Sequence, residues 1–355
     1  MRFAIVRFDE PGGVRTVTDR LAADLANRGH SAELIDVPPP RQTRIRAWAA
    51  QHAPRRLLAK VPPAARASRH PDHLPSAPKT DPEVVIVSHP HLHGTFTPVS
   101  ARGPVLIGCY HDSWDAALRS GHSIAIRRNY AAMDAIVLLT GADAEAASRD
   151  LGRSVIAIPN AAPELDAEIS GHRPDRIVML TRHEPQKDIQ LALRAWECSR
   201  LAQEGMTLEI FGNGTLLAKH LRIVKRRRIA GVRFTRWSDD PLAELRQSLA
   251  LLSTSSHEGF PSSFLEAMAT GTPIITVDSA PACRELVHPD SGFLVPERSP
   301  EAVSAGLLAA AQLTPSQRED YAKASLILAE EVSRPRVTER WLRLAEGLLQ
   351  QKESR

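Results

Sequence analysis

Residues 249–277 read LALLSTSSHEGFPSSFLEAMATGTPIITV, so that an apolar run, a polar loop, a helical segment and a second apolar run follow one another. Short apolar runs separated by helical segments are typical of βαβ units, whose strands form parallel sheets. The same alternation continues along the chain, with FAIV and EVVIVS before this stretch and GFLV after it. The pattern predicts an α/β protein.

The chain length and one break in the pattern predict two domains. A chain of 355 residues is long for a single core and suits two α/β domains. The stretch NAAPELDAEISGHRP, residues 160–174, has no periodicity and is the predicted linker. We therefore expect Rossmann-like domains at 1–165 and 166–335, followed by a helix at 336–355 that packs back toward the N-terminal domain.

Composition favours a soluble globular protein of a reducing compartment. The chain is 43% hydrophobic and 24% charged. Its three cysteines, Cys109, Cys198 and Cys283, are far apart and indicate neither a disulfide framework nor a zinc site. The start MRFAIVRF lacks the features of a signal peptide, and no apolar run reaches the ~20 residues that span a bilayer. We expect a cytoplasmic protein whose membrane contact, if any, is peripheral at the inner face.

Two basic stretches indicate an anionic partner. Residues 37–71 contain eight Arg or Lys residues and no acidic residue, and residues 211–238 form a second stretch without acids. Such stretches attract nucleotide diphosphates, phospholipid headgroups, polyphosphate polymers or nucleic acid. The run KRRRIAGVR, residues 225–233, is typical of a solvated helix end, and it lacks the interleaved aromatic residues of a nucleic-acid site. We therefore expect no nucleic-acid partner.

Two glycine turns lie between a predicted strand and a predicted helix. One contains Gly12 and Gly13, and the other contains Gly212, Asn213 and Gly214. Glycine lets backbone amides approach a phosphate closely, and a helix N-terminus adds partial positive charge. Neither turn completes the dinucleotide fingerprint GxGxxG. A tight βα turn without ligand contact remains the alternative for both.

Arg182 and Lys187 follow the strand RIVMLT and precede the next helix. Ligands of doubly wound sheets lie at the carboxyl ends of the strands. Two cations at such an end can hold a diphosphate and stabilise its charge as it leaves. We favour this role over an ordinary solvated loop.

Two glutamates flank the next predicted helix. Glu258 lies in the loop after LALLST, and Ser262 or Ser263 is placed to cap the helix that contains Glu266. Amides at a helix start can face an anion or sugar hydroxyls. Ser263 and Glu266 also have the spacing of a capping box, so a purely structural role for Glu266 remains open.

These motifs together resemble glycosyltransferase family 4. Glu258 and Glu266 are separated by seven residues, as in the EX7E motif of that family, and EGFPSSFLEAMATGTPII is similar to its sequences almost throughout. The GG turn, the R-x4-K pair, the GNG turn and VRFTRW occur in the same order. The resemblance implies a GT-B fold, in which two Rossmann-like domains face a central cleft, and a retaining glycosyltransferase that moves a hexose or N-acetylhexosamine.

The resemblance also implies roles for individual residues. Arg182 and Lys187 would bind the donor diphosphate, Glu258 would lie beside the donor sugar, and His111 would approach the transferred sugar and acceptor. Glu266 would hold the ribose hydroxyls, and Arg236 lies where the family reads the base. The remaining donor-binding candidates are Gly12, Gly13, Gly212, Asn213, Gly259, Phe260, Pro261 and Ser262. The chain departs from the family at Asp188, where many members have glycine, and at Thr181, where glycine is usual.

The expected donor is a UDP- or GDP-sugar, used without a metal or other cofactor. The sequence contains no DxD triplet, which argues against the metal-dependent route of the other large glycosyltransferase fold. The transition state is oxocarbenium-like, so catalysis must stabilise negative charge on the diphosphate and positive charge on the ring. The acceptor is expected to be a polysaccharide, a teichoic-type polymer or a lipid-linked glycan, because Trp48 and the arginines of 37–71 favour an anionic acceptor.

Several alternatives remain open. A nucleotide-sugar epimerase of the same fold would use the cleft without an acceptor, and a noncatalytic protein would bind nucleotides without turnover. In HPHLHG, His89, His91 and His93 would share one face of an extended strand, which permits a metal site, although no acidic ligand accompanies them. Asp112 and Asp115, beside His111, could tune an acceptor site, or Asp112 or Ser113 could simply cap a helix.

Overall fold

The computed structural model describes residues 1–10, 12–39, 81–92, 103–165 and 174–354. The chain forms two compact units. Unit 1 comprises residues 1–160 and 335–355, and unit 2 comprises residues 161–334. The basic stretch predicted to meet the acceptor, residues 37–71, lies outside the described residues from position 40 onward, as does His93.

Unit 1 contains a six-stranded parallel sheet of order β2-β1-β3-β4-β5-β6. Ile5 of the central strand pairs with Leu34 on one side and with Ile86 on the other. Strands of such a sheet are buried on both faces, which explains their nearly continuous apolar sequences. The strands are β1 (Arg2–Phe8), β2 (Ser31–Val37), β3 (Val84–Val87), β4 (Val105–Cys109), β5 (Ala135–Leu138) and β6 (Ile156–Ala157).

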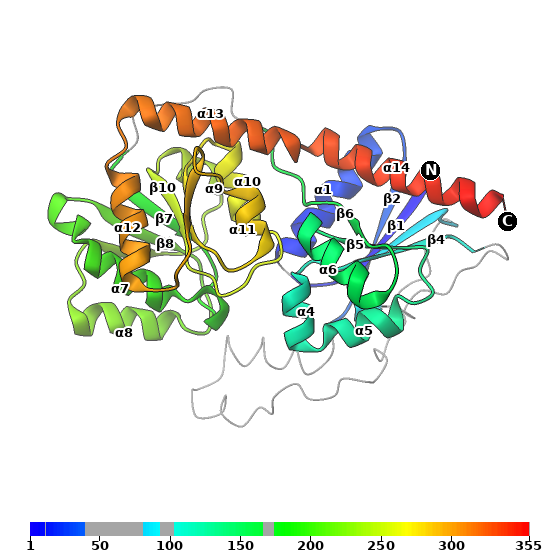
Figure 1. Cartoon of the computed structure of the whole chain (residues 1–355), viewed down its shortest axis with the longest axis horizontal. Helices are drawn as coiled ribbons and strands as arrows, with labels where there is room; N and C mark the ends of the chain where they lie inside the picture. The colour runs from blue at the N-terminus through cyan, green and yellow to red at the C-terminus, as the bar shows by residue number, and fades with distance from the viewer. Residues whose placement is uncertain (11, 40–80, 93–102, 166–173, 355) are drawn as a thin grey trace. The chain divides into compact units, whose positions relative to one another are not determined.

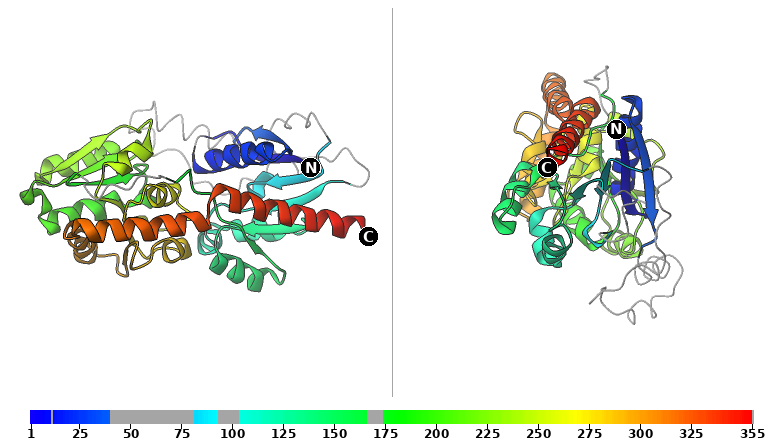
Figure 2. Two further views of the ribbon diagram at one scale, coloured as in Figure 1. Left: turned by 90° about the horizontal axis from the view of Figure 1, so that it is seen from above. Right: turned by 90° about the vertical axis from the view of Figure 1, so that its right-hand side faces the viewer.

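Helices surround the sheet of unit 1, and its last helix comes from the far end of the sequence (Figure 1). The helical elements are α1 (Gly13–Asn27), the 3-10 helix η1 (Pro90–Leu92), α4 (Trp114–Ser120), α5 (His122–Asn129), α6 (Gly141–Leu151) and α14 (Arg334–Glu353). Figure 2 shows α14 beside α1 and the sheet of this unit. Trp341 of α14 is buried, and Glu339 forms a 2.9 Å ion pair with Arg28. Near the end of the helix, Lys352 donates a hydrogen bond of 2.7 Å to the carbonyl of Pro104.

Unit 2 contains a second six-stranded parallel sheet, of order β12-β11-β10-β7-β8-β9. Its strands are β7 (Arg176–Leu180), β8 (Thr207–Phe211), β9 (Val232–Thr235), β10 (Ala250–Ser253), β11 (Ile274–Val277) and β12 (Gly292–Val295). The helical elements are η2 (Pro185–Lys187), α7 (Ile189–Ser199), η3 (Leu201–Glu204), α8 (Leu217–Arg227), α9 (Pro241–Arg246), α10 (Ser262–Ala269), α11 (Pro281–Leu286), α12 (Pro300–Ala311) and α13 (Pro315–Glu331).

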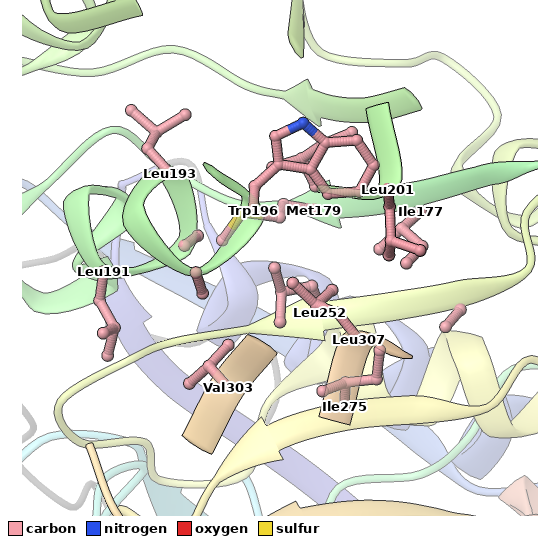
Figure 3. Close-up of a cluster of buried hydrophobic side chains, with 14 of the residues drawn as sticks. Ile177, Met179, Leu191, Leu193, Trp196, Leu201, Leu252, Ile275, Val303 and Leu307 are labelled. Carbon is pink, nitrogen blue, oxygen red and sulfur yellow. The ribbon is translucent and has the colours of Figure 1, made fainter. Parts of the chain in front are cut away.

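The core of unit 2 lies between the sheet and helices α7 and α12. Figure 3 shows Trp196 of α7 above Met179 of β7, with Val303 and Leu307 of α12 nearby. Trp196 is 1% exposed, and its indole nitrogen donates a 2.9 Å hydrogen bond to the carbonyl of Ala230. A buried indole N–H needs such a partner, since leaving it unpaired costs free energy. This core holds the strand ends in fixed positions.

Each sheet has one place where the strand order reverses. In unit 1 the order runs outward from β1 on one side and from β3 on the other, and in unit 2 the reversal lies between β7 and β10. Ligands of open α/β sheets bind at such switch points, beyond the carboxyl ends of the two strands. The predicted parallel α/β architecture is confirmed, and among the described strands the two-residue β6 is too short to give an apolar run in the sequence.

Candidate functional site

Two loops meet at the switch point of unit 2. One follows β7 and comprises residues 181–188, and the other follows β10 and comprises residues 254–261. The amide of Ser256 donates a 2.7 Å hydrogen bond to the carbonyl of Gln186, and the side chain of Gln186 donates one of 2.8 Å to the carbonyl of His257. The hydroxyl of Thr254 donates to the carbonyl of Lys187 at 3.1 Å. The two loops therefore form one hydrogen-bonded body.

This arrangement brings Lys187 and Glu258 into contact, although they are 71 residues apart in sequence. The ammonium nitrogen of Lys187 lies 2.5 Å from a carboxylate oxygen of Glu258. The two side chains are only 17% and 9% exposed. A charge so poorly hydrated needs a partner, and removing either one would leave the other uncompensated.

Arg182 belongs to the same loop but is exposed. Within the described parts of the chain its guanidinium forms no hydrogen bond or ion pair. A guanidinium offers several donors in a fixed plane, which suits a phosphate. The loop thus carries one cation that is paired and one that can bind an anion directly.

Asp188 occupies the position at which many family members have glycine, and its backbone conformation shows how aspartate fits there. It has the left-handed conformation, with φ of 39°, which glycine adopts most readily and aspartate more readily than most residues. Its side chain caps α7 by accepting a 3.3 Å hydrogen bond from the amide of Leu191, and it pairs with Arg298 at 2.8 Å. Arg298 was not among the predicted residues, although its place just after β12, at the same sheet edge, was a usable signal.

The Gly212–Gly214 turn packs against the Arg182 loop. A Cβ on Gly212 would lie 1.9 Å from the carbonyl oxygen of Thr181, and one on Gly214 would lie 2.7 Å from the backbone of His183. The carbonyl of Asn213, whose side chain is exposed, accepts a 2.8 Å hydrogen bond from the amide of His183. Close approach of two backbones is therefore sufficient to require both glycines.

Two buried histidines, His183 and His220, lie next to the Gly212–Gly214 turn. His183 and His220 are buried, with their Nδ1 atoms 3.0 Å apart. Burial lowers the pKa of both, that of His220 to about 4. Neither Nε2 atom has a hydrogen-bond partner among the described residues. The pair is therefore neutral at pH 7 and supports the loops rather than adding charge to them.

The start of α10 corrects one prediction. The helix begins at Ser262 with Pro261 as its N-cap, and no side chain caps it. The prediction that Ser262 or Ser263 caps the helix is therefore wrong, and so is the capping-box explanation of Glu266. The carbonyl of Pro261 accepts the 3.0 Å hydrogen bond from Phe264, which fixes the helix start one residue earlier than expected.

The other predicted residues of this region surround the helix start. Gly259, Phe260 and Pro261 are buried, and Glu266 is half-buried on the first turns of α10. The first turn contains no acidic residue, so its amides present partial positive charge. The capping-box alternative no longer accounts for Glu266.

An exposed aromatic residue lies at the end of β9, next to predicted Arg236. Trp237 is 54% exposed, and its ring lies 3.6 Å from the position of a Cβ on Gly212. Arg236 is also exposed. Trp237 belongs to the motif VRFTRW but was not among the predicted residues, because the exposure of a single tryptophan cannot be deduced from its sequence position. An exposed indole beside a glycine turn offers a flat apolar surface.

The remaining predicted residues lie in unit 1. Gly12 is the N-cap of α1, and Gly13 is its first residue. His111 follows β4 and is half-buried. Its Nδ1 has no partner among the described residues, and burial lowers its pKa to about 4. Ser113 caps α4 by accepting a hydrogen bond of 3.2 Å from Ala116, which confirms the capping alternative at this position.

The metal alternative at HPHLHG requires an extended strand through its three histidines, and the described part of this segment does not form one. Strand β3 ends at Val87, and His91 lies in the 3-10 helix η1. The backbone therefore turns before the histidines can alternate along a strand. In the described ranges no three His, Cys, Asp or Glu side chains could hold a metal ion. No described helix combines the length and apolarity needed to cross a membrane.

Two family models match consecutive parts of the chain. The model "Glycosyltransferase Family 4" matches residues 11–164, and the model "Glycosyl transferases group 1" matches residues 164–325. Together they extend over both units.

Two curated relatives match at lower coverage. An exopolysaccharide phosphotransferase of Streptomyces coelicolor is 28% identical over 230 residues, which are 63% of this chain and 24% of that protein. A poly(glycerol-phosphate) alpha-glucosyltransferase of Bacillus subtilis is 24% identical over 168 residues, which are 47% of this chain and 25% of that protein. The chain thus matches about a quarter of the length of each relative.

Solved structures share the fold. Sucrose-phosphate synthase from Thermosynechococcus elongatus has a TM-score of 0.73 at 14% identity, with 98% of each chain covered. A mutant of S. aureus TarM in complex with fondaparinux, alpha-GlcNAc-glycerol and UDP has a TM-score of 0.65 at 17% identity, with 74% of this chain and 55% of that chain covered. These likenesses concern the fold alone, and they confirm the predicted GT-B architecture of two Rossmann-like domains.

Proposed function

We propose that this chain, which belongs to the GT-B glycosyltransferases with a family 4 domain followed by a group 1 domain, transfers a sugar from a nucleoside diphosphate to a cell-envelope acceptor. The observation that carries the proposal is the contact between the Arg182–Lys187 loop and the Glu258 loop at the switch point of unit 2. This is the place where an α/β sheet binds its ligand.

The donor diphosphate is proposed to bind Arg182 and Lys187. Lys187 would exchange part of its contact with Glu258 for a phosphate oxygen, and exposed Arg182 would bind a second oxygen. Stabilising the departing diphosphate is the main electrostatic task of the reaction. The amides at the start of α10, near Gly259 and Pro261, contribute further partial positive charge.

The sugar nucleoside is proposed to extend from this point in two directions. Glu258 would orient the donor sugar and stabilise positive charge on its ring, while Glu266 would hold the ribose hydroxyls. Gly212, Asn213 and Arg236 would lie at the base. The donor is proposed to be a UDP- or GDP-sugar carrying a hexose or N-acetylhexosamine, and transfer is proposed to retain the anomeric configuration. The lack of a DxD triplet favours a reaction without a metal.

The acceptor side is proposed to lie on unit 1, with His111 near the transferred sugar and Gly13 near the donor phosphate. A glycan or a teichoic-type polymer is the favoured acceptor, because one relative is named for transfer to poly(glycerol phosphate) and one similar structure contains a glycosyl-glycerol. The basic stretch 37–71 suits such a polyanion or an anionic membrane surface. We propose a cytoplasmic enzyme at the inner face of the membrane.

A donor screen tests the function. The thermal midpoint is measured with UDP, GDP and ADP and with their common sugar conjugates, and hydrolysis of the stabilising donor is then followed by chromatography. We expect one nucleotide to raise the midpoint and its sugar conjugate to be hydrolysed. Glu258→Gln should abolish hydrolysis, whereas Glu297→Gln, on an exposed residue after β12, should not. Nucleotide binding without any hydrolysis or transfer would favour the noncatalytic alternative.

A second function, phosphotransfer, is raised by the name of the Streptomyces relative. A donor labelled separately in its sugar and its β-phosphate distinguishes the two reactions, because glycosyl transfer moves only the sugar label. The same products reveal an epimerase, which would return an epimeric donor with both labels. Appearance of the phosphate label in the acceptor would replace our proposal.

A further inference from the structure

The switch point of unit 1 carries a group of aromatic and imidazole side chains that the proposed mechanism does not use. Strand β1 ends at Phe8 and its neighbour β3 ends at Val87, two residues before His89. The rings of Phe8 and His89 are 5.1 Å apart. This sheet edge corresponds in topology to the edge of unit 2 that holds Lys187 and Glu258.

Three histidines meet there, and we term His89, His91 and His122 the imidazole cluster. The ring centroids of His89 lie 5.2 Å from those of His91 and of His122, and the His91 and His122 centroids are 5.6 Å apart. Two of these residues come from the segment after β3 and one from the start of α5. His91 is exposed, and the other two are half-buried.

Hydrogen bonds orient the rings of the imidazole cluster. The Nδ1 atom of His89 accepts a 3.2 Å hydrogen bond from the backbone of His91, so the neutral ring carries its proton on Nε2. The Nδ1 atom of His122 is 3.0 Å from the hydroxyl of Tyr110. No Nε2 atom of the three rings has a hydrogen-bond partner in the described parts of the chain. These nitrogens, together with Nδ1 of His91, are left to bind a ligand.

The surroundings of the imidazole cluster offer it no ion pair. The described groups next to it are His111 after β4, which repels a charged His89, and Tyr110, whose hydroxyl is 3.0 Å from Nδ1 of His122. Asp112 lies near Tyr110, and the side-chain amide of Asn129 donates a 2.8 Å hydrogen bond to the carbonyl of Pro90. None of the described carboxylates forms an ion pair with His89, His91 or His122. An anionic ligand could therefore supply the countercharge that no described carboxylate provides to these three rings.

The rings also depress one another's basicity. Burial, followed by repulsion from His122, His91 and His111, lowers the pKa of His89 to about 3, and burial lowers the pKa of His91 and His122. A dianion placed among the rings would oppose this repulsion and favour their protonation. The first turn of α5 contains no acidic residue, and its Gly121 N-cap has no side chain, so its amides can face the same anion.

We propose that the imidazole cluster binds a phosphate group of the acceptor and takes up protons as it binds, so that acceptor affinity rises as pH falls. This inference rests on the proposed transferase function, because it assigns the chemistry of the acceptor side. A phosphate ester supplies several acceptor oxygens and a charge between −1 and −2, which matches three ring nitrogens that can each become donors. The described histidines do not converge as metal ligands, which disfavours a metal at this place.

Titration of the full-length chain with inorganic phosphate tests the inference. Imidazole resonances are followed by NMR, and proton uptake is measured by calorimetry in buffers of different ionisation enthalpy. We expect uptake of about one proton at pH 8, where free phosphate is already the dianion, so that affinity rises up to about tenfold as the pH is lowered by one unit toward 7. His91→Gln and His122→Gln should each weaken phosphate binding by roughly five- to tenfold and reduce the proton uptake, since each removes one charged hydrogen bond.

His30→Gln is the matched control. His30 lies before β2 at the opposite, amino end of the sheet and contacts Phe3 and the N-terminal amine, so phosphate binding should not change. Circular dichroism melting curves establish that each variant is folded. Phosphate binding that is absent at millimolar concentration, or that is the same in His91→Gln and His122→Gln as in the wild type, would overturn the inference.

Further probes identify the source of the phosphate and separate the two proposals. Binding of sn-glycerol 3-phosphate indicates a polymer-like acceptor, whereas binding to phosphatidylglycerol vesicles but not to phosphatidylcholine vesicles indicates a lipid headgroup. Donor hydrolysis is measured in parallel. Proton-linked phosphate binding without donor turnover would leave the site standing and reject the transferase. Donor turnover together with phosphate binding that is unchanged in His91→Gln and His122→Gln would support the transferase and reject the phosphate site.

Discussion

The two units place different chemistry at the same position of the same fold. At the switch point of unit 2 a lysine and a glutamate compensate each other at 2.5 Å, and two loops are hydrogen-bonded around them. At the switch point of unit 1 three imidazoles lie within 5.6 Å of one another with no carboxylate paired to them in the described parts of the chain. The fold therefore fixes where a ligand binds, and the side chains decide which ligand and at what pH.

The two places differ in how they provide charge. In unit 2 a lysine and a glutamate form an ion pair, so a cation for a diphosphate is present before the ligand binds. The histidines of unit 1 become charged only when acid or an anionic ligand favours it.

The largest effect is expected for Lys187→Ala. This change removes the cation proposed to stabilise the leaving diphosphate and leaves Glu258 without its partner. We expect kcat/KM for donor turnover to fall on the order of 1,000-fold, about 4 kcal/mol in transition-state stabilisation. The control is Lys219→Ala on the exposed side of α8, which should retain activity. Equal activity of both variants would remove Lys187 from the mechanism.

A smaller effect, on stability, is expected for Gly212→Ala. The new Cβ would lie 1.9 Å from the carbonyl oxygen of Thr181 at a φ of 139°, so the Gly212–Gly214 turn must move away from the 181–188 loop. We expect the free energy of unfolding to fall by about 2–4 kcal/mol, measured in urea. In unit 1, Gly12→Ala has a similar φ but open space around the Cβ, and should cost only about 1 kcal/mol. Equal costs would show that the loop contact is not what requires Gly212.

Trp237→Ala should weaken nucleotide binding to unit 2. Its exposed indole beside Gly212 suits stacking against a base, which aromatic side chains stabilise by about 1–2 kcal/mol. Calorimetry with the stabilising nucleotide should therefore give a Kd raised roughly five- to thirtyfold. Leu221→Ala, at another exposed apolar residue of unit 2, should leave the Kd unchanged. The same Kd for both variants would place the base elsewhere.

The smallest effect is a change in pH dependence. His89 has its pKa lowered to about 3 in the folded protein, so the unfolded chain binds a proton at higher pH than the folded chain does. Stability is therefore full above pH 6.5, and it falls between about pH 6.5 and pH 3 by up to about 1.4 kcal/mol per unit for this residue. His89→Gln should reduce the loss of unfolding free energy between pH 6 and pH 5 by about 1 kcal/mol. An unchanged slope in urea unfolding would show that His89 is not buried in its neutral form.

The sequence predicted the sheets well because buried parallel strands consist of short runs of apolar residues. FAIV became part of β1 and GFLV became β12, whereas β6 escaped notice because two residues, Ile156 and Ala157, make no pattern. Helix starts were less predictable. Ser263 had the correct spacing for a cap, but the backbone carbonyl of Pro261 begins the helix instead.

The candidate site was likewise predictable only in part. Arg182, Lys187 and Glu258 could be named because they follow strands that parallel topology brings to one edge. The 2.5 Å contact between Lys187 and Glu258, the support from Arg298 and the exposure of Trp237 depend on how loops fold over one another, which no local pattern encodes. The imidazole cluster was visible only in part, since His122 is 31 residues from His91 in the sequence.

Helix α14 has a consequence for the order in which the chain can fold. Unit 1 consists of residues 1–160 and 335–355, so its sheet is made early but its Trp341 and Glu339 contacts become available only after all of unit 2 has been synthesised. Domains generally fold as units as they leave the ribosome. Unit 2, which is continuous from residue 161 to residue 334, can therefore complete its core first. Unit 1 is complete only when residues 335–355 have been synthesised.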